Sequence, residues 1–151
     1  MHWKTILVPH DFSSSANHAA ALARDEARMH GGALMLLHVI DLPSQLPHDA
    51  AIVPAGDGAQ ISIKDYAINS AETHLQDLAA RLAKDGVTAT THVRLGLTVD
   101  EINRFVDENA VDLIVMGTHG HTGIRAFLAG SITEKVVRSA KVPVLTVRHP
   151  D

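Results

Sequence analysis

The residues with the clearest chemical potential lie between Gly117 and Gly130, where four of the ten glycines of this 151-residue chain are concentrated. They follow an apolar run at residues 113–116 and precede Ser131, a residue type that caps the first turn of helices. A strand, a glycine-rich turn and a helix N-terminus together expose backbone N–H groups and the positive end of a helix dipole. This arrangement predicts a phosphate-binding loop that needs no basic side chain. The alternative is that the glycines only permit tight turns.

Two common phosphate motifs are absent from the chain. The first apolar run ends in Pro9-His10-Asp11-Phe12-Ser13, which holds no glycine, so the dinucleotide fingerprint is missing where it belongs. A Walker A sequence, which ends in Gly-Lys-Ser or Gly-Lys-Thr, occurs nowhere. The sequence therefore supports neither NAD binding nor P-loop chemistry.

The eleven histidines raise the alternative of a metal site. His119 and His121 flank Gly120 in the predicted loop, but the chain has no cysteine and no His-Glu-x-x-His helix, so no transition-metal ligand set is recognisable. A Gly-x-Ser-x-Gly elbow and a separated Ser, His and Asp set are also absent. We therefore predict no metal site built from side chains and assign no catalytic residue.

The elements that position this loop are predicted from five apolar runs of strand length, at residues 5–9, 33–39, 88–94, 112–116 and 143–148. Between them lie four stripes at helical spacing, the first made of alanines and the others mainly of larger apolar residues: Ala16, Ala19, Ala20, Ala23 and Ala27; Ile68, Ala71, Leu75, Leu78 and Leu82; Val99, Ile102, Phe105 and Val106; Ile132, Val136 and Val137. Repeated strand-then-helix order predicts one α/β domain over residues 1–151. Its parallel sheet is doubly wound, with helices on both faces.

Glycines and hydroxyl residues mark the expected helix ends. Gly31 and Gly86 stand where left-handed C-terminal caps are wanted. A capping box, in which a hydroxyl and a carboxylate bond free N–H groups of the first turn, is predicted twice. As an N-cap, Ser131 stabilises its helix by about 1 kcal/mol whether or not phosphate binds. The two predicted boxes are Thr98 with Glu101 and Ser131 with Glu134.

Residues 41–63 interrupt this rhythm. They contain three of the six prolines and two glycines, with no clear period. The segment is predicted to be a loop, and loops of this length are usually functional or mobile. Two interpretations stay open, a surface connection between the second strand and the second helix, and a lid over a binding site.

Composition narrows the function classes. The chain has 13 Lys and Arg against 17 Asp and Glu, a net charge of −4 and no basic run, which disfavours nucleic-acid binding. The lack of cysteine excludes disulfides, thiol catalysis and cysteine-ligated metals. No stretch of about 18 apolar residues and no secretory segment is visible, so we expect a cytoplasmic protein without membrane insertion.

The glycine loop has the spacing Gly117-x2-Gly120-x9-Gly130-Ser131. This spacing is the ATP-binding signature of the universal stress protein family, which the chain resembles. The resemblance runs nearly from end to end, through residues 6–13, 37–40, 112–117 and 143–147. It implies a Rossmann-like fold of the adenine nucleotide alpha hydrolase type, with strand order 3-2-1-4-5. Because strands one and four are neighbours where this order reverses, we expect a ligand at their carboxyl ends.

The resemblance also implies a role for nine residues, taken position by position. Gly117, Gly120, Gly130 and Ser131 are expected to surround the ribose and phosphates of a bound ATP. Ile132 is expected to add a backbone N–H. Magnesium is expected to be held mainly by the ATP phosphates, since that ion keeps its waters and takes few protein ligands.

The remaining four residues are expected at the base and sugar. The resemblance implies that Asp11 faces the nucleoside and that Val39 meets the adenine edge through its backbone. Pro9 and Met116 are expected to line the pocket. The sequence departs from the commoner family pattern at His10, His121 and Ala126, and these departures leave the preference among ATP, ADP and AMP open.

The last apolar run, residues 143–148, is expected at a sheet edge. An exposed apolar edge favours association, and self-pairing about a two-fold axis would give a homodimer. The resemblance implies the same association through the last strand. The alternative is a monomer whose edge is blunted by Pro143 and Arg148.

Three functions follow from these observations. The preferred one is a dimeric, nucleotide-sensing regulator of the stress response in which occupancy by ATP orders residues 117–130 and the 41–63 segment. The second is a slow, magnesium-dependent ATPase or autophosphorylating enzyme. The third is a dimeric scaffold that holds no nucleotide.

Overall fold

Five parallel strands form the predicted sheet. The computed structural model describes residues 1–54, 56, 58–118 and 131–148. Within them the sheet strands are β1 (Thr5–Pro9), β2 (Ala33–Ile40), β5 (Ala89–Leu95), β6 (Leu113–Gly117) and β7 (Val144–Val147). Their order is β5-β2-β1-β6-β7, and every neighbouring pair is parallel. The predicted order 3-2-1-4-5 is therefore confirmed, and no strand end differs from its prediction by more than one residue.

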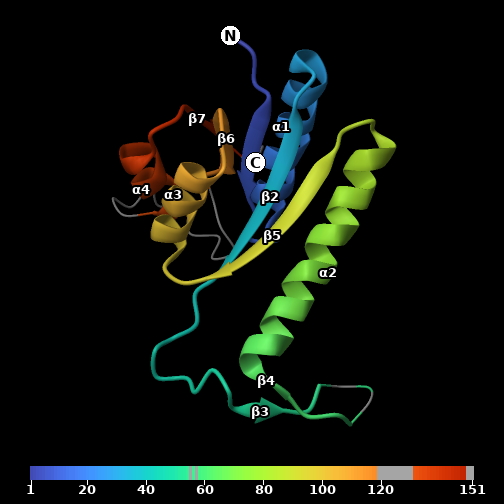
Figure 1. The fold of residues 1–151 in the computed structure, drawn as a ribbon, viewed down its shortest axis with the longest axis vertical. Coiled ribbons are helices and arrows are strands. Elements are labelled where there is room, and N and C mark those ends of the chain that lie inside the picture. The colour runs from blue at the N-terminus through green and yellow to red at the C-terminus, as the bar shows by residue number, and fades with distance from the viewer. Residues whose placement is uncertain (55, 57, 119–130, 149–151) are drawn as a thin grey trace.

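The central strand β1 is fixed against β6 at its start as well as along its length. The Asp112 carboxylate, just before β6, accepts backbone N–H groups of Lys4 at 2.7 Å and of Thr5 at 2.8 Å. Further along, Ile6 pairs with Leu113. Because the two strands run parallel from this point, their carboxyl ends lie at the same edge of the sheet (Figure 1).

Helices cover both faces of the sheet, as predicted. α1 (Ser14–His30) and α2 (Ile63–Lys84) lie on one face, and α3 (Thr98–Glu108) and α4 (Ile132–Ser139) on the other (Figure 1). Because successive strand residues point to opposite faces, Ile6 and Val8 pack in the cluster under α1 and α2, and Leu7 packs in the cluster under α3 and α4. None of the helices within the described residues is long and apolar enough to cross a membrane.

α1 packs closely on the sheet because its inner face is made of alanine. All five residues of the predicted stripe are buried, namely Ala16, Ala19, Ala20, Ala23 and Ala27. Ser13 is the N-cap, and its side chain accepts the Ala16 N–H at 3.1 Å. Gly31 ends the helix in the left-handed conformation, with φ of +63°, as the sequence predicts. A side chain with a Cβ is disfavoured in that conformation.

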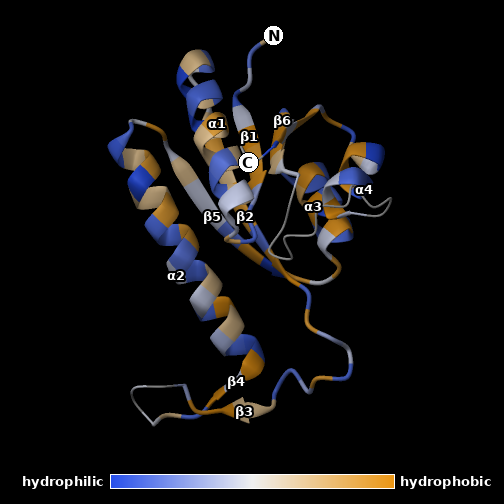
Figure 2. Cartoon of the chain, turned by 180° about the vertical axis from the view of Figure 1, so that it is seen from behind, coloured by the Kyte–Doolittle hydropathy of each residue, from blue (hydrophilic) through white to orange (hydrophobic). Residues whose placement is uncertain are grey.

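The 41–63 segment differs in part from the predicted loop. It contains a short antiparallel pair, β3 (Ala51–Ile52) and β4 (Ile61–Ser62), which leads directly into α2. Ser62 is the N-cap of α2 and accepts the Asp65 N–H at 3.0 Å. Figure 1 shows this pair at the end of α2, beyond the sheet, and Figure 2 shows hydrophobic residues in both short strands.

Two predictions about helix starts and faces need correction. α3 begins at Thr98 itself, so its N-cap is Leu97 and no side chain caps it; the predicted box of Thr98 is wrong. Ser131 does cap α4 and accepts the Glu134 N–H at 3.1 Å. The predicted apolar stripe of α4 is buried only at Val136, because Ile132 is 43% and Val137 50% exposed.

Candidate functional site

A pocket of about 430 Å³ lies at the carboxyl ends of β1, β2 and β6. This is the edge where the strand order reverses and where open α/β sheets bind ligands. Seven of the nine predicted site residues line it: Pro9, Asp11, Val39, Met116, Gly117, Ser131 and Ile132. The other two, Gly120 and Gly130, lie outside the described residues. The structure thus brings together residues that are separated by up to 123 positions in the chain.

The turn between β1 and α1 is built from consecutive side-chain contacts to backbone N–H groups. His10 Nδ1 accepts the Phe12 N–H at 3.1 Å, and Asp11 Oδ1 accepts the Ser13 N–H at 3.0 Å. The Ser13 hydroxyl also donates to Asp11 Oδ1 and accepts the first-turn N–H of Ala16. In each case a side chain accepts the N–H of the residue two positions later, as a backbone carbonyl oxygen does in an ordinary turn. They fix Asp11 in the wall of the pocket.

Phe12 has a left-handed backbone, with φ of +65°. This conformation is uncommon for a bulky residue. Its ring is surrounded by three imidazoles, with ring centroids 5.4 Å from His10, 4.5 Å from His38 and 5.0 Å from His74. His38, on β2, donates from Nδ1 to the His10 carbonyl oxygen at 2.7 Å. We call His10, Phe12, His38 and His74 the histidine cluster; it joins β1, β2 and α2 beside the pocket.

His10 is the most buried histidine of this cluster, at 5% exposure. Burial lowers its pKa below the ordinary value of 6.5. Asp11 and Asn17 oppose this shift, and His38 and Arg81 add to it. The imidazole is therefore neutral at pH 7. Its Nε2 atom is buried without a hydrogen-bond partner among the described residues.

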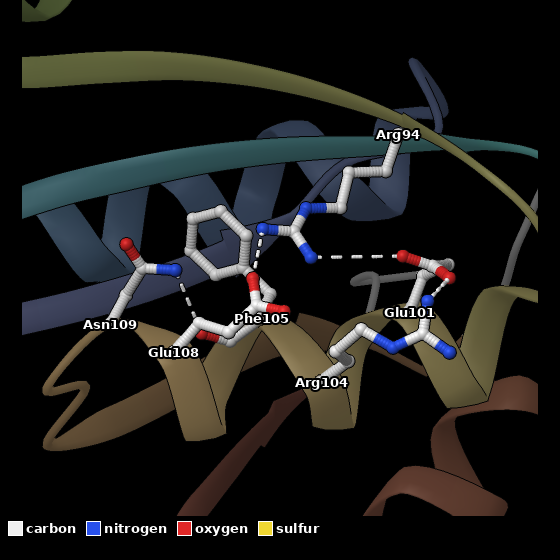
Figure 3. Close-up of polar contacts among 6 residues, drawn as sticks. All are labelled: Arg94, Glu101, Arg104, Phe105, Glu108 and Asn109. Carbon is white, nitrogen blue, oxygen red and sulfur yellow. Dashed lines mark hydrogen bonds and ion pairs between the residues drawn. The ribbon is translucent and has the colours of Figure 1, made fainter.

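A second wall of the pocket is formed by the N-terminal part of α3, where Thr98 and Ile102 line it. An ion-pair network attaches this helix to the end of β5 (Figure 3). The Glu101 side chain is only 9% exposed, and its carboxylate lies 2.6 Å from Arg104 and 3.7 Å from Arg94. Arg94 also pairs with Glu108. The sequence predicts Glu101 in a capping box, whereas the structure shows its carboxylate in this network.

The third wall is formed where α4 meets the end of β6. The Thr133 hydroxyl donates to the Gly117 carbonyl oxygen at 2.8 Å, which attaches the first turn of α4 to the strand. Because Ser131 and Ile132 line the pocket at this N-terminus, the positive end of the helix dipole faces the cavity. Anionic groups are stabilised at such a position.

The chemistry of the lining fits a ligand with apolar, polar and anionic parts. Pro9, Val39 and Met116 provide apolar surface, while Asp11 and Ser131 provide polar atoms. No Lys or Arg is found among the described residues of the lining, so an anionic group there would depend on backbone N–H and hydroxyl groups. Nowhere in the described part of the chain do three His, Cys, Asp or Glu side chains gather as metal ligands do.

Several residues of the lining were not predicted from the sequence, namely Ser13, His38, Thr98, Ile102, Thr118 and Thr133, and His10 was noted only as a departure from a pattern. The sequence does hold a signal for His38. Residues 34, 36 and 38 share one face of β2, and the last of them is polar. Thr98 and Ile102 have none, since their place depends on how α3 docks.

Comparisons with known proteins show which family this chain is similar to. The sequence profile of the Universal stress protein family matches residues 2–148. Universal stress protein G of Escherichia coli O157:H7 is 31% identical over 153 residues, covering 97% of this chain and 99% of the relative. Universal stress protein MJ0577 of Methanocaldococcus jannaschii is 28% identical over 155 residues, covering 97% and 96%. A solved structure of MJ0577 superimposes with a TM-score of 0.81 and covers 100% and 99% of the two chains.

Two further solved structures share the fold at lower identity. A universal stress protein from Archaeoglobus fulgidus in complex with dAMP is 24% identical, with a TM-score of 0.67, and covers 97% of this chain and 98% of that one. A universal stress protein in complex with cAMP is 22% identical, with a TM-score of 0.71, and covers 98% of each chain.

Proposed function

Since the chain belongs to the universal stress protein family, we propose that its pocket binds an adenine nucleotide, with ATP as the principal ligand. Occupancy of the pocket then acts as a regulatory signal in the response to stress. The observation that carries the proposal is the convergence of seven predicted site residues on one cavity of about 430 Å³. A cavity of this size lies within the range of small-molecule sites.

The adenine base is the part of the proposed ligand that the structures of relatives support most directly. Two relatives with the same fold were solved with dAMP and with cAMP, and both ligands contain adenine. In this chain the base lies against the apolar surface of Pro9, Val39 and Met116, and the Val39 backbone meets its edge. Asp11 faces the nucleoside, where a carboxylate accepts hydroxyl groups.

The phosphates lie at the N-terminus of α4, next to Ser131 and Ile132. Backbone N–H groups and the helix dipole hold them there, and Gly117 allows the first turn of α1 to lie close to the end of β6. Gly120 and Gly130 complete this part of the site in the proposal. Magnesium is carried by the phosphates, in keeping with its preference for water and phosphate oxygens.

Binding rather than turnover is the activity that the lining favours. Asp11 is the one carboxylate among its described residues, and Ser13 donates to it twice. Both bonds end on Oδ1; in the proposal the other oxygen, Oδ2, accepts the hydroxyl groups of the nucleoside, which leaves no free acceptor for the water that a general base would activate. We therefore propose that Asp11 positions the nucleoside, and that hydrolysis or autophosphorylation is at most slow.

Calorimetric titration with ATP, ADP and AMP, with and without Mg²⁺, tests this function. We expect one nucleotide to bind per chain, with heat released on binding. A single-turnover assay in the same buffer should form little ADP while ATP stays bound. Absence of heat with all three nucleotides would count against the proposal and in favour of a nucleotide-free scaffold.

We further propose that two copies of the chain associate through β7. This strand is the last in the sheet order, and its Leu145 side chain is 36% exposed. Val137 on α4 is 50% exposed and extends the apolar surface beyond the strand. Pairing the two strand edges about a two-fold axis would cover these groups.

Replacing Leu145 by lysine should weaken this dimer. The two-fold axis brings two ammonium groups together at a surface that was apolar, so self-association should fall by about a hundredfold. Sedimentation equilibrium measures this change. Tyr66→Lys, at a residue 46% exposed on α2, is the matched control and should sediment as the wild type. A wild-type protein that is monomeric at high concentration would contradict the proposal.

A further inference from the structure

The hydrogen bond between His10 and Phe12 requires a particular protonation state. Nδ1 of His10 accepts the Phe12 N–H at 3.1 Å, and a nitrogen accepts only when it carries no proton. The neutral ring therefore holds its proton on Nε2. A second proton, taken from solvent, binds Nδ1 and turns it into a donor that faces another donor. Protonation of His10 thus breaks this bond.

The other histidine bond in the cluster does not respond in this way. His38 Nδ1 lies 2.7 Å from the His10 carbonyl oxygen, which only accepts, so this nitrogen carries a proton in both charge states of His38. His74 contacts Phe12 through its ring, and its Nδ1 lies 2.7 Å from the Ser70 carbonyl oxygen within α2. His10 is therefore the member of the cluster whose bond depends on being neutral.

The surroundings of His10 come from four elements. Asp11 lies in the same turn, Asn17 comes from α1, His38 from β2 and Arg81 from α2. Burial has the largest effect and disfavours the charged imidazole; Asp11 and Asn17 favour the charged form, and His38 and Arg81 disfavour it. The imidazole stays neutral at neutral pH and is protonated only in more acidic solution.

Loss of this bond has a structural consequence because Phe12 is held at φ of +65°. Such a conformation persists only where surrounding contacts hold it in place. Phe12 stands between Asp11 and Ser13, whose mutual contacts define the pocket wall. A relaxed Phe12 would shift both of these residues.

We propose that His10 is a positioning residue: its neutral imidazole holds the turn of residues 9–13 in the form that presents Asp11 to the ligand, and its protonation weakens nucleotide binding. The effect on the nucleotide rests on the proposed function. The effect on the turn does not, because it follows from the contacts of the chain itself. The protein thus holds a turn whose shape depends on pH in the wall of its pocket.

Two variants separate this role from general stability. His10→Asn keeps an acceptor that suits a turn of this kind and does not titrate. His10→Leu removes the acceptor at every pH. His2→Asn makes the same exchange at an exposed histidine before β1, at the opposite end of that strand, and is the matched control.

The experiment compares ATP affinity at about pH 7.5 and about pH 5, because the lowered pKa of His10 moves its protonation to the acidic side of the ordinary histidine range. For the wild type and His2→Asn we expect a three- to tenfold larger loss of affinity on acidification than for His10→Asn, about the contribution of one hydrogen bond. His10→Leu should bind weakly at both pH values. Comparison with His10→Asn removes the contribution of other histidines, whose protonation attracts phosphate.

A second measurement on the same proteins uses no nucleotide. The Phe12 amide proton signal in NMR spectra should shift as the wild type is acidified and should stay in place in His10→Asn. A Phe12 signal that does not titrate, or a parallel loss of affinity in the wild type and His10→Asn, would overturn the proposal. If no protein binds ATP at either pH, the proposed function fails, whereas the Phe12 signal still decides the role of His10.

Discussion

Alanine in place of Gly117 is expected to destabilise the protein and to weaken nucleotide binding together. A Cβ at this position would lie 2.2 Å from Ser15 Oγ and 2.7 Å from the Ser15 backbone carbon. Because these atoms belong to the first turn of α1, the helix and the end of β6 have to move apart. Overpacking of this kind costs about 3 kcal/mol in the free energy of unfolding.

The same displacement affects the pocket. Ser15 follows the Asp11 and Ser13 turn by two residues, so a shift of α1 moves the Asp11 carboxylate relative to Gly117. We expect the folded variant to bind ATP about tenfold more weakly, which corresponds to one displaced hydrogen bond. Urea denaturation measures the first effect, and calorimetric titration below the unfolding transition measures the second.

Gly32→Ala is the matched control for Gly117→Ala. Its Cβ would lie 2.4 Å from the Trp3 carbonyl oxygen, a comparable clash before β2 and at the opposite end of the sheet from the pocket. This variant should lose stability to a similar extent while its folded form keeps wild-type affinity. Equal losses of affinity in both variants would show that Gly117 has no particular role at the site.

Phe105→Ala should have the largest effect on stability alone. Phe105 is 1% exposed and belongs to the core cluster under α3 and α4. The Arg94 guanidinium lies 4.9 Å from its ring centroid, and the ring centroids of His92 and Phe105 are 4.9 Å apart. Removing a buried aromatic ring and leaving a cavity costs about 3–5 kcal/mol. The urea midpoint should fall accordingly.

Two comparisons separate the ring from its surroundings. Phe105→Leu keeps most of the apolar contact and should cost about 1.5 kcal/mol or less. Tyr66→Ala truncates an exposed ring on α2 and should change stability by less than about 0.5 kcal/mol. If Phe105→Ala were no more costly than Tyr66→Ala, the packing described between β5 and α3 would be wrong.

The features predicted correctly from the sequence are those with a strong local signal. Apolar runs indicate buried strands because a strand covered on both faces excludes polar residues. The alanine stripe of α1 and the left-handed Gly31 are likewise local in origin. The meeting of Asp11 and Gly117 at one pocket followed from the strand order, because parallel strands end at the same edge of a sheet.

The features that were missed depend on tertiary contacts. β3 and β4 are two-residue strands held by their pairing with each other, so neither has a pattern of its own. Glu101 has the sequence position of a capping residue, but Arg94 and Arg104 draw its carboxylate into the network of Figure 3. The left-handed Phe12 was not anticipated, since bulky residues rarely adopt this conformation.

A crystal structure of the wild type grown with ATP and Mg²⁺ tests the central claim most directly. The account predicts adenine against Val39 and Met116, the ribose near Asp11, and the phosphates at the N-terminus of α4 beside Ser131. Density for ATP at another surface, or protein atoms filling the cavity between β1 and β6 while ATP is present at saturation, would contradict it.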